Sequence, residues 1–538
     1  MSRSRGVPSI APPCVPPYTF RGSMFVRGGL AVVSAGLLVG SLPSPDLGWL
    51  GWFALVPLLI AIQGLNPLCA AGLGLVTGIV SSFGIFGWLF EVPSFDLRHA
   101  ILLALYVGAY PAMWSAATAW LTKRGIPLMV SAPALWLAFN YARAHAGFLA
   151  LPWGTLAQTQ HLNLPLLQFA GLVGEHGITF LVAAGNAALA VVILRREQPA
   201  AIATGVLLVL VHLWGAVVLA VEQSHPTVAV AAIQPNIQIN ERATEAGRNA
   251  NLARLEQLTR LAAQSHPTLI VWPESAIPGD LSDAALVSRL QTLSDSIGIP
   301  LILGAAEVEK FAGTEGPVTI GRHAFNTAYL FRPGEPLGPP YRKRMLVPFA
   351  EYVPHPDIIP WPEWLAPRVM ELTPGEHPQA FSVLPALSVG TLICWENLFA
   401  PLARESVEGG ATLLVQLTND VWFGRSAAPW QHNLMSVMRA VENRTPIVIA
   451  SNTGPSQVID GYGRVIGGTG KIFSAGFTTG SAPLGTGGTL YSSVGDLALL
   501  VLLIPLGLSQ FWRRATTDAR SVPRGSCARR GTPDASTV

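Results

Sequence analysis

Residues 390 to 399 read GTLICWENLF, an apolar run that ends in a cysteine, a tryptophan and a glutamate. A continuous apolar run followed by polar residues is typical of a strand that is buried on both faces of a sheet. Cys394 at the end of this run has two interpretations. It is either a small hydrophobic residue of the core, as free cysteines usually are, or a nucleophile.

The region around this stretch, about 224–488, shows the alternation of an α/β domain. A buried strand over TVAVAAIQPN (227–236) precedes NLARLEQLTRLAAQ (251–264), where apolar residues recur at helical spacing. Further strands are predicted at TLIVWPE, PLILGAAE, NTAYLF, ATLLVQLTND and PIVIASNTG. Several of these strands end in Pro, Asn, Glu or Asp, and open α/β folds place their sites at such carboxyl ends.

The chain as a whole is too apolar for a soluble protein. Half of its 538 residues are hydrophobic and 12% are charged, against about 25% in soluble domains. Eight segments are about long enough to cross a bilayer core, which takes about 20 helical residues. These spans are expected near 27–44, 48–65, 70–90, 100–121, 126–142, 177–194, 201–221 and 490–512.

Basic residues in the short loops orient the spans. They precede the first span and follow the fourth, the sixth and the last, at Arg21, Arg27, Lys123, Arg124, Arg195, Arg196, Arg513 and Arg514. With a cytoplasmic N-terminus, all of them lie on the cytoplasmic side, as the positive-inside rule requires. The predicted organisation is a disordered tail (1–20), seven spans (21–223), an extracytoplasmic domain (224–488), an eighth span (489–514) and a disordered tail (515–538).

Charge and cysteine content exclude several classes of function. The net charge of +3 is too small to indicate a nucleic-acid partner. The cysteines, Cys14, Cys69, Cys394 and Cys527, form no CxxC or Cys/His cluster with metal spacing. We therefore expect no metal, no cofactor and no disulfide framework, and no function for the three cysteines other than Cys394.

Three segments carry residues that could assist a cysteine nucleophile. LIVWPESAIP supplies Glu274, YRKRMLVPFAEYVP supplies Lys343 and Glu351, and LICWEN supplies Glu396 beside Cys394. Such a nucleophile needs a base or a cation to favour its thiolate, and a donor for the negative oxygen of the intermediate. A carboxylate and an ammonium fill these roles without a histidine, but the spacing alone does not show that they converge.

The blocks WPES, YRKRMLVPFAEYVP, ICWEN, LTNDVWFG and PWQH resemble, in this order, the signature blocks of the nitrilase superfamily. In particular they resemble the membrane-bound apolipoprotein N-acyltransferases of Gram-negative bacteria, over nearly the whole chain. The resemblance implies a four-layer αββα sandwich joined to an α-helical bundle of about eight transmembrane spans. It implies Glu274, Lys343 and Cys394 as catalytic residues and Glu351 as a further essential glutamate.

The reaction that the resemblance implies moves an acyl chain from the sn-1 ester of a phospholipid, usually phosphatidylethanolamine. The acceptor is the N-terminal amine of the S-diacylglyceryl-cysteine of an apolipoprotein. Glu274 would take the thiol proton, Cys394 would form a thioester, and Lys343 would hold the oxyanion with the backbone N–H of Trp395. An ester donor and an amine acceptor at one cysteine predict ping-pong kinetics. The implied enzyme is a monomer in the bacterial inner membrane, with its catalytic domain in the periplasm and both termini in the cytoplasm.

The chain departs from the family pattern at three positions. It has Met345 where a histidine is frequent, Trp395 where a tyrosine is frequent, and Ala350 where a glycine is usual. None of them carries one of the three catalytic charges, so we expect only details of the pocket, such as chain-length preference, to differ.

Other polar residues have more modest predicted roles. Glu396 is expected to orient its neighbours, and His432 to make a buried hydrogen bond. Ionisable groups in membrane segments are costly and mark functional positions, so Arg143 and Glu175, with Trp153 in the loop LPWGTLAQTQ, are candidate lipid contacts. The stretch HPDIIPWPEWLAP (355–367) suits a lid at the membrane interface.

Two other functions compete with this interpretation. A membrane-tethered amidase of the nitrilase type would use the same residues with water as acceptor, but one helix would be enough to tether it. A transporter with an external binding domain is the second alternative, but the spans lack the paired broken-helix pattern of transport sites.

Overall fold

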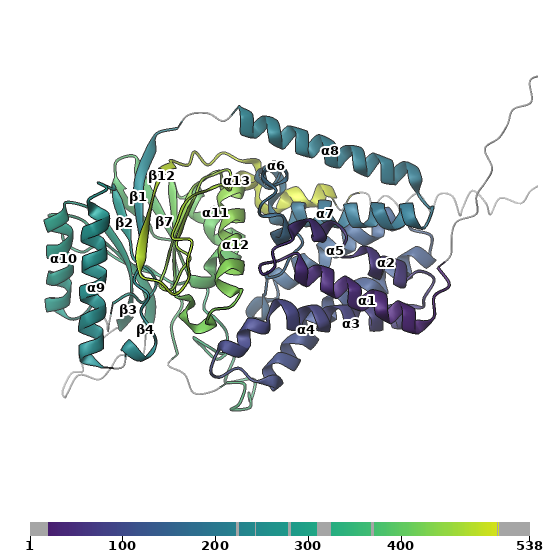
Figure 1. The fold of residues 1–538 in the computed structure, drawn as a ribbon, viewed down its shortest axis with the longest axis horizontal. Helices are drawn as coiled ribbons and strands as arrows, with labels where there is room; N and C mark the ends of the chain where they lie inside the picture. Colours follow the sequence, from purple (N-terminus) through teal and green to yellow (C-terminus); the bar gives the residue numbers. More distant parts are fainter. Residues whose placement is uncertain are drawn as a thin grey trace, which may run out of the picture.

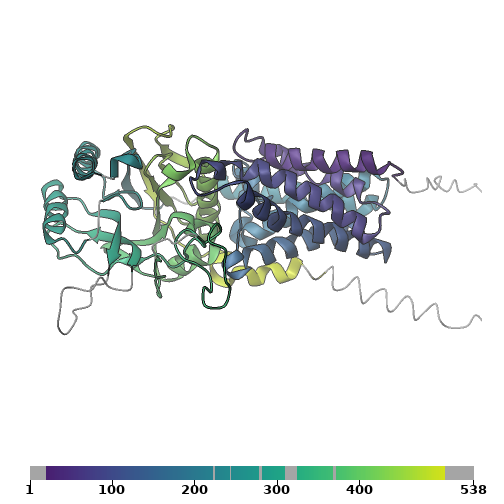
Figure 2. The same ribbon diagram turned by 90° about the horizontal axis from the view of Figure 1, so that it is seen from below.

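The computed structural model describes residues 20–221, 225–242, 244–277, 281–308, 324–366, 371–502 and 504. These residues form two parts that lie end to end, a helical region and a layered α/β domain (Figures 1 and 2). The predicted disordered tails, 1–20 and 515–538, lie outside the described residues except for Phe20.

Two six-stranded sheets form the centre of the α/β domain. Their strand orders are β12-β1-β2-β3-β4-β5 and β11-β10-β9-β8-β7-β6. The first sheet contains β1 Thr227–Gln234, β2 Leu269–Val271, β3 Leu301–Val308, β4 Ala324–Phe331, β5 Tyr341–Arg342 and β12 Gly476–Pro483. The second contains β6 Ala380–Leu384, β7 Leu387–Ile393, β8 Leu413–Thr418, β9 Ile447–Ser451, β10 Gln457–Ile459 and β11 Val465–Gly468.

The strands at the centre of each sheet are parallel, β1 to β3 in one and β7 to β9 in the other. The first and last strands of the domain pair antiparallel, with Thr227 opposite Pro483. The chain therefore enters and leaves the domain at neighbouring positions.

Helices cover the outer face of each sheet, which completes a four-layer αββα sandwich (Figure 1). α9 Glu245–Ala263 and α10 Ala284–Ile297 cover the first sheet, while α11 Ala400–Glu408 and α12 Ala428–Asn443 cover the second. Along β1, Val230 and Ala232 pack between the two sheets, whereas Ala231 and Ile233 pack beneath the helices. Both faces of β1 are thus buried, which explains its unbroken apolar sequence, and the predicted α/β sandwich is confirmed.

The helical region consists of apolar helices that pack against α11 and α12 through one continuous core. It contains α1 Met24–Gly40, α2 Val56–Ala61, α3 Pro67–Ile85, α4 Leu97–Lys123, α5 Leu128–Ala144, α6 Leu164–Leu167, α7 Ala170–Ile193 and α8 Gln198–Ala220, and α13 Leu490–Val494 follows the α/β domain. Four of these described helices, α3, α4, α7 and α8, are long and apolar enough to cross a membrane. Each of the first seven expected spans overlaps a helix, though α2 is short, and the eighth, 490–512, is described only over 490–502 and at 504, so the number eight is approximate.

α7 is interrupted near its start. Gly174 has φ 67° and ψ −177°, outside the helical region, a conformation that glycine adopts at little cost. A Cβ at this position would lie 2.5 Å from the ring of Tyr491. The break frees the backbone N–H of Glu175 from the helix, and this N–H donates to Glu442 of α12 at 2.7 Å.

Candidate active site

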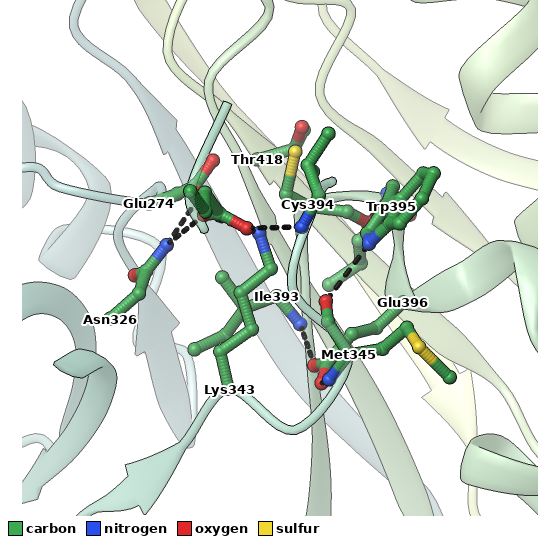
Figure 3. Close-up of polar contacts among 12 residues, drawn as sticks. Glu274, Asn326, Lys343, Met345, Ile393, Cys394, Trp395, Glu396 and Thr418 are labelled. Carbon is green, nitrogen blue, oxygen red and sulfur yellow. Dashed lines mark hydrogen bonds and ion pairs between the residues drawn. The ribbon is translucent and has the colours of Figure 1, made fainter. Parts of the chain in front are cut away.

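Glu274, Lys343 and Cys394 meet at the carboxyl ends of strands from both sheets. Glu274 follows β2, Lys343 follows β5, and Cys394 is the first residue of the 3-10 helix η6 Cys394–Leu398 after β7. Figure 3 shows the three side chains close to one another. Residues that are 120 positions apart in the sequence thus form one cluster, which spacing alone could not establish.

Lys343 lies between two carboxylates. Its Nζ is 2.8 Å from Oε1 of Glu351 and 3.9 Å from Oε1 of Glu274, and its side chain is only 1% exposed. Asn326 of β4 donates to Oε1 of Glu274 at 2.7 Å (Figure 3). Glu351 also accepts from the backbone N–H of Val347 at 2.7 Å. The ammonium is therefore fixed by hydrogen bonds rather than free to move as a surface lysine does.

Burial and charge set the protonation states of the cluster. Burial raises the pKa of Glu274, and the Lys343 ammonium opposes this rise. Burial lowers the pKa of Lys343, but the carboxylates of Glu351 and Glu274 outweigh it, so the net pKa is raised. Burial, followed by the Glu274 carboxylate, raises the pKa of the Cys394 thiol well above its ordinary value. The Cys394 thiol is thus a weaker acid than usual, and the Glu274 carboxylate is a stronger base than usual.

The backbone of Cys394 is in the left-handed region, with φ 55°, where a residue with a side chain is strained. Its carbonyl oxygen accepts from Nε2 of Gln416 at 3.3 Å and lies 3.2 Å from Nε2 of His432. His432 is buried and its Nδ1 is 3.0 Å from Asp420. These contacts hold the strained turn, and they include the buried hydrogen bond expected of His432.

Glu396 joins the two segments that carry Lys343 and Cys394. One carboxylate oxygen accepts from the backbone N–H groups of Arg344 and Met345 at 2.7 and 3.0 Å. The other accepts from the N–H of Ile393 at 2.7 Å and from the hydroxyl of Tyr341 at 2.9 Å. Every group that faces the carboxylate is a donor, so the site requires a side chain that only accepts.

Replacing Glu396 with glutamine is therefore expected to destabilise the protein. The amide would present two N–H groups to groups that are themselves donors, and a hydrogen bond to a charged group contributes about 1.5–3 kcal/mol. We expect a loss of at least about 3 kcal/mol, measured by thermal unfolding in detergent. Glu405→Gln is the matched control, because Glu405 is 37% exposed and pairs with Arg344, and such pairs contribute about 1 kcal/mol or less. Equal stability of the two variants would contradict the prediction.

Two of the three departures from the family pattern, Met345 and Trp395, pack together beside the site. The indole Nε1 of Trp395 donates to the carbonyl of Met345 at 2.9 Å, and its ring meets Phe399 edge to face. A cavity of about 370 Å³ lies beyond them, between the α/β domain and the helical region. Its lining is mostly apolar, and it includes Met345, Phe399, Glu175 and Arg439.

The three candidate lipid contacts lie in this boundary. Arg143 is 7% exposed and donates to the carbonyl of Trp153 at 3.0 Å. Trp153 stacks on His432 with ring centroids 5.9 Å apart. Glu175 forms an ion pair at 2.7 Å with Arg439 of α12. All three contact other protein groups, and the lipid contact itself stays a prediction.

The described part of the expected lid, 355–366, contacts the start of α4. Nε2 of His99 is 2.8 Å from the carbonyl oxygen of Trp364, and the guanidinium of Arg98 lies over the Trp364 ring. Trp361 packs edge to face against Phe148 of the helical region. This segment therefore connects the α/β domain to the helical region.

The residues that sequence reasoning missed are partners rather than reactants. Asn326 is a polar residue in the apolar strand AFNTAYLF, which was a usable signal. Tyr341 and Arg439 carried no such signal, because their partners are 55 and 264 positions away in the sequence.

Comparisons with known proteins cover both parts of the chain. The family model for carbon-nitrogen hydrolases matches residues 229–481, and that for the apolipoprotein N-acyltransferase N-terminal domain matches residues 34–188. The apolipoprotein N-acyltransferase of Geobacter metallireducens is 35% identical over 489 residues, which cover 87% of this chain and 91% of that protein. The enzyme of the same name from Gloeobacter violaceus is 31% identical over 509 residues, covering 90% and 94%. A solved amidase of the nitrilase superfamily from Nesterenkonia AN1 has a TM-score of 0.37 at 20% identity, covering 52% of this chain and 97% of its own.

Proposed function

The chain belongs to the apolipoprotein N-acyltransferase family, and we propose that its acyl transfer passes through a thioester on Cys394. It is a bacterial membrane enzyme that acylates lipoproteins in the last step of their maturation. A membrane-tethered amidase is not favoured, because the family match extends through the helical region. The observation that carries the thioester proposal is the convergence of Glu274, Lys343 and Cys394 at the carboxyl ends of strands from both sheets.

In the first half-reaction, Glu274 takes the thiol proton and the sulfur of Cys394 attacks the ester carbonyl of the acyl donor. Lys343 and the backbone N–H of Trp395 donate to the oxyanion that forms. The C–O bond then breaks, and the leaving alkoxide takes the proton from Glu274. Glu351 positions Lys343 through the 2.8 Å ion pair.

In the second half-reaction, the N-terminal amine of the acceptor attacks the thioester. Glu274 removes a proton from the amine, the C–S bond breaks, and the proton returns to the sulfur. The product is an amide, and the thiol is regenerated. We propose a phospholipid as donor, because the 370 Å³ cavity at the boundary with the apolar helices has a mostly apolar surface that suits an acyl chain, with charged residues such as Glu175 and Arg439 among its lining.

The topology that we propose places the catalytic domain, residues 224–488, in the periplasm and both termini in the cytoplasm. The membrane parts are residues 21–223 and 489–514. The basic loop residues support this orientation. We further propose that the enzyme is a monomer, that Arg143, Trp153 and Glu175 line the path of the lipid, and that the segment 355–366 is its lid.

The thioester is tested by intact mass after incubation of the detergent-purified protein with phosphatidylethanolamine alone. We expect one added acyl mass, removable by hydroxylamine, on the wild-type protein but not on Cys394→Ala. An unmodified wild-type protein beside intact phospholipid would overturn the donor assignment.

The pH dependence should report Glu274. The reaction needs its carboxylate, so kcat/KM falls as the pH falls through its pKa, and burial places this limb above the ordinary 4.5. The N–H of Asn326 stabilises the charged form, so Asn326→Leu should raise the pKa and move the limb to higher pH by about 0.5–1 unit. A limb that stays in place or moves to lower pH would contradict the role of Glu274 as base.

A further inference from the structure

Two residues of α12, His432 and Arg439, contact the two ends of the segment that carries Cys394, and each of them also meets a residue of the helical region. This segment is η6, Cys394–Leu398. At its first residue, the carbonyl oxygen of Cys394 lies 3.2 Å from Nε2 of His432, and Trp153 stacks on the His432 ring. At its last residue, the carbonyl of Leu398 accepts from Nη1 of Arg439 at 3.2 Å.

Arg439 is held in turn by the broken helix α7. Its Nη2 donates to Glu175 at 2.7 Å and to Glu442 at 3.1 Å, and the backbone N–H of Glu175 donates to the same Glu442 oxygen at 2.7 Å. The far oxygen of Glu175 accepts from Thr155 at 2.6 Å. Glu175, Arg439 and Glu442 are all buried, so this arrangement is weakly screened and has little freedom to adapt.

Trp153 is also held by hydrogen bonds, which come from α12 and from the helical region. Its Nε1 donates to Gln431 at 2.8 Å, and Gln431 donates to the carbonyl of Pro43, which follows α1. Arg143 of α5 donates to the carbonyl of Trp153 at 3.0 Å. The contacts of Trp153 with His432 and of Glu175 with Arg439 therefore connect the helical region to the turn that holds Cys394.

The strained backbone of Cys394, with φ 55°, needs support from its surroundings. We propose that Glu175 and Trp153 are positioning residues: through Arg439 and His432 they hold the Cys394–Leu398 turn, so the membrane helices set the reactivity of the nucleophile itself. The inference deepens the proposed function and rests on Cys394 as nucleophile. The helical region would then have two roles, supplying the lipid and holding the turn that carries Cys394.

The test measures the reactivity of Cys394 without any lipid. Iodoacetamide is small and water-soluble, and its rate of alkylation at Cys394 in full-length protein is followed by mass spectrometry. We expect Glu175→Gln and Trp153→Leu each to lower this rate at least tenfold, because a misplacement of about 1 Å can cost about 100-fold. Trp153→Phe, which keeps a ring over His432, should stay within about threefold of wild type.

Glu197→Gln is the matched control. Glu197 also lies in the helical region and accepts two backbone hydrogen bonds, from Leu128 and Met129 at 2.9 and 3.0 Å, but it does not contact the turn. Its alkylation rate should equal that of wild type. Thermal unfolding is measured for every variant, and Trp153→Leu decides the matter if Glu175→Gln unfolds at the assay temperature.

Alkylation at the wild-type rate in both Glu175→Gln and Trp153→Leu would overturn the proposal, whether or not transfer from phospholipid falls. A fall in lipid transfer alone would assign these residues to the lipid path. The outcome does not depend on the donor assignment, because no phospholipid is present. Failure of the proposed function would appear separately, as acyl transfer retained by Cys394→Ala.

Discussion

Replacing Cys394 with alanine is expected to lower acyl transfer by about 10⁴-fold or more, since loss of a covalent nucleophile removes the reaction path and not one contact. The variant should fold, because the cysteine is a small, partly buried residue at the end of β7. Transfer to a diacylglyceryl peptide is followed by mass spectrometry, with unfolding measured in parallel.

Cys69→Ala is the control for this substitution. Cys69 is the other free cysteine among the described residues, and it lies at the start of α3, next to Asn66. Its replacement should leave transfer unchanged. A Cys394→Ala enzyme that kept more than about 1% of wild-type activity would rule out the thioester.

Lys343→Met should produce the second large effect, on activity and stability together. Loss of one oxyanion donor lowers kcat by about 10²–10³-fold. The substitution also leaves the carboxylates of Glu274 and Glu351 buried without their shared cation. Breaking a buried pair by removing one partner costs about 3–5 kcal/mol, which is measured by thermal unfolding.

A second substitution separates the two effects of Lys343→Met. In Lys343→Met/Glu351→Gln one buried carboxylate is neutralised, so we expect stability to recover by about half while activity stays low. Arg342→Met is the control, because Arg342 is 34% exposed and its partner is Glu307; it should cost about 1 kcal/mol or less. Recovery of activity in the double variant would show that Lys343 serves only to balance charge.

The sandwich could be predicted from the sequence because its central strands are buried on both faces and read as unbroken apolar runs. Glu274 and Cys394 could be singled out as candidates in the same way, since each follows such a run, but their convergence with Lys343 could not be predicted from spacing. The number of membrane spans was less certain, because hydropathy does not distinguish a crossing helix from a shorter one. α2, for example, is a six-residue helix inside the expected span 48–65.

The contacts between the two parts of the molecule could not be predicted. In the structure the ion-pair partner of Glu175 is Arg439, 264 positions away, because Gly174 breaks α7 and turns Glu175 toward α12. Local sequence shows that a glycine permits such a break, but it does not show which distant charge will meet it.

The pairing of Thr227 with Pro483 gives the catalytic domain the form of an insertion whose two ends meet at one point. Exchanging residues 227–483 with those of a relative would therefore need two junctions that are neighbours in space, and it would leave both sheets intact. A chimera built in this way should fold, and its success as an enzyme should depend on whether the guest domain and the host helices bring matching partners for Trp153 and Glu175. In this chain, the two ends of the domain that carries the nucleophile lie side by side, while its side chains contact residues of its own helical region.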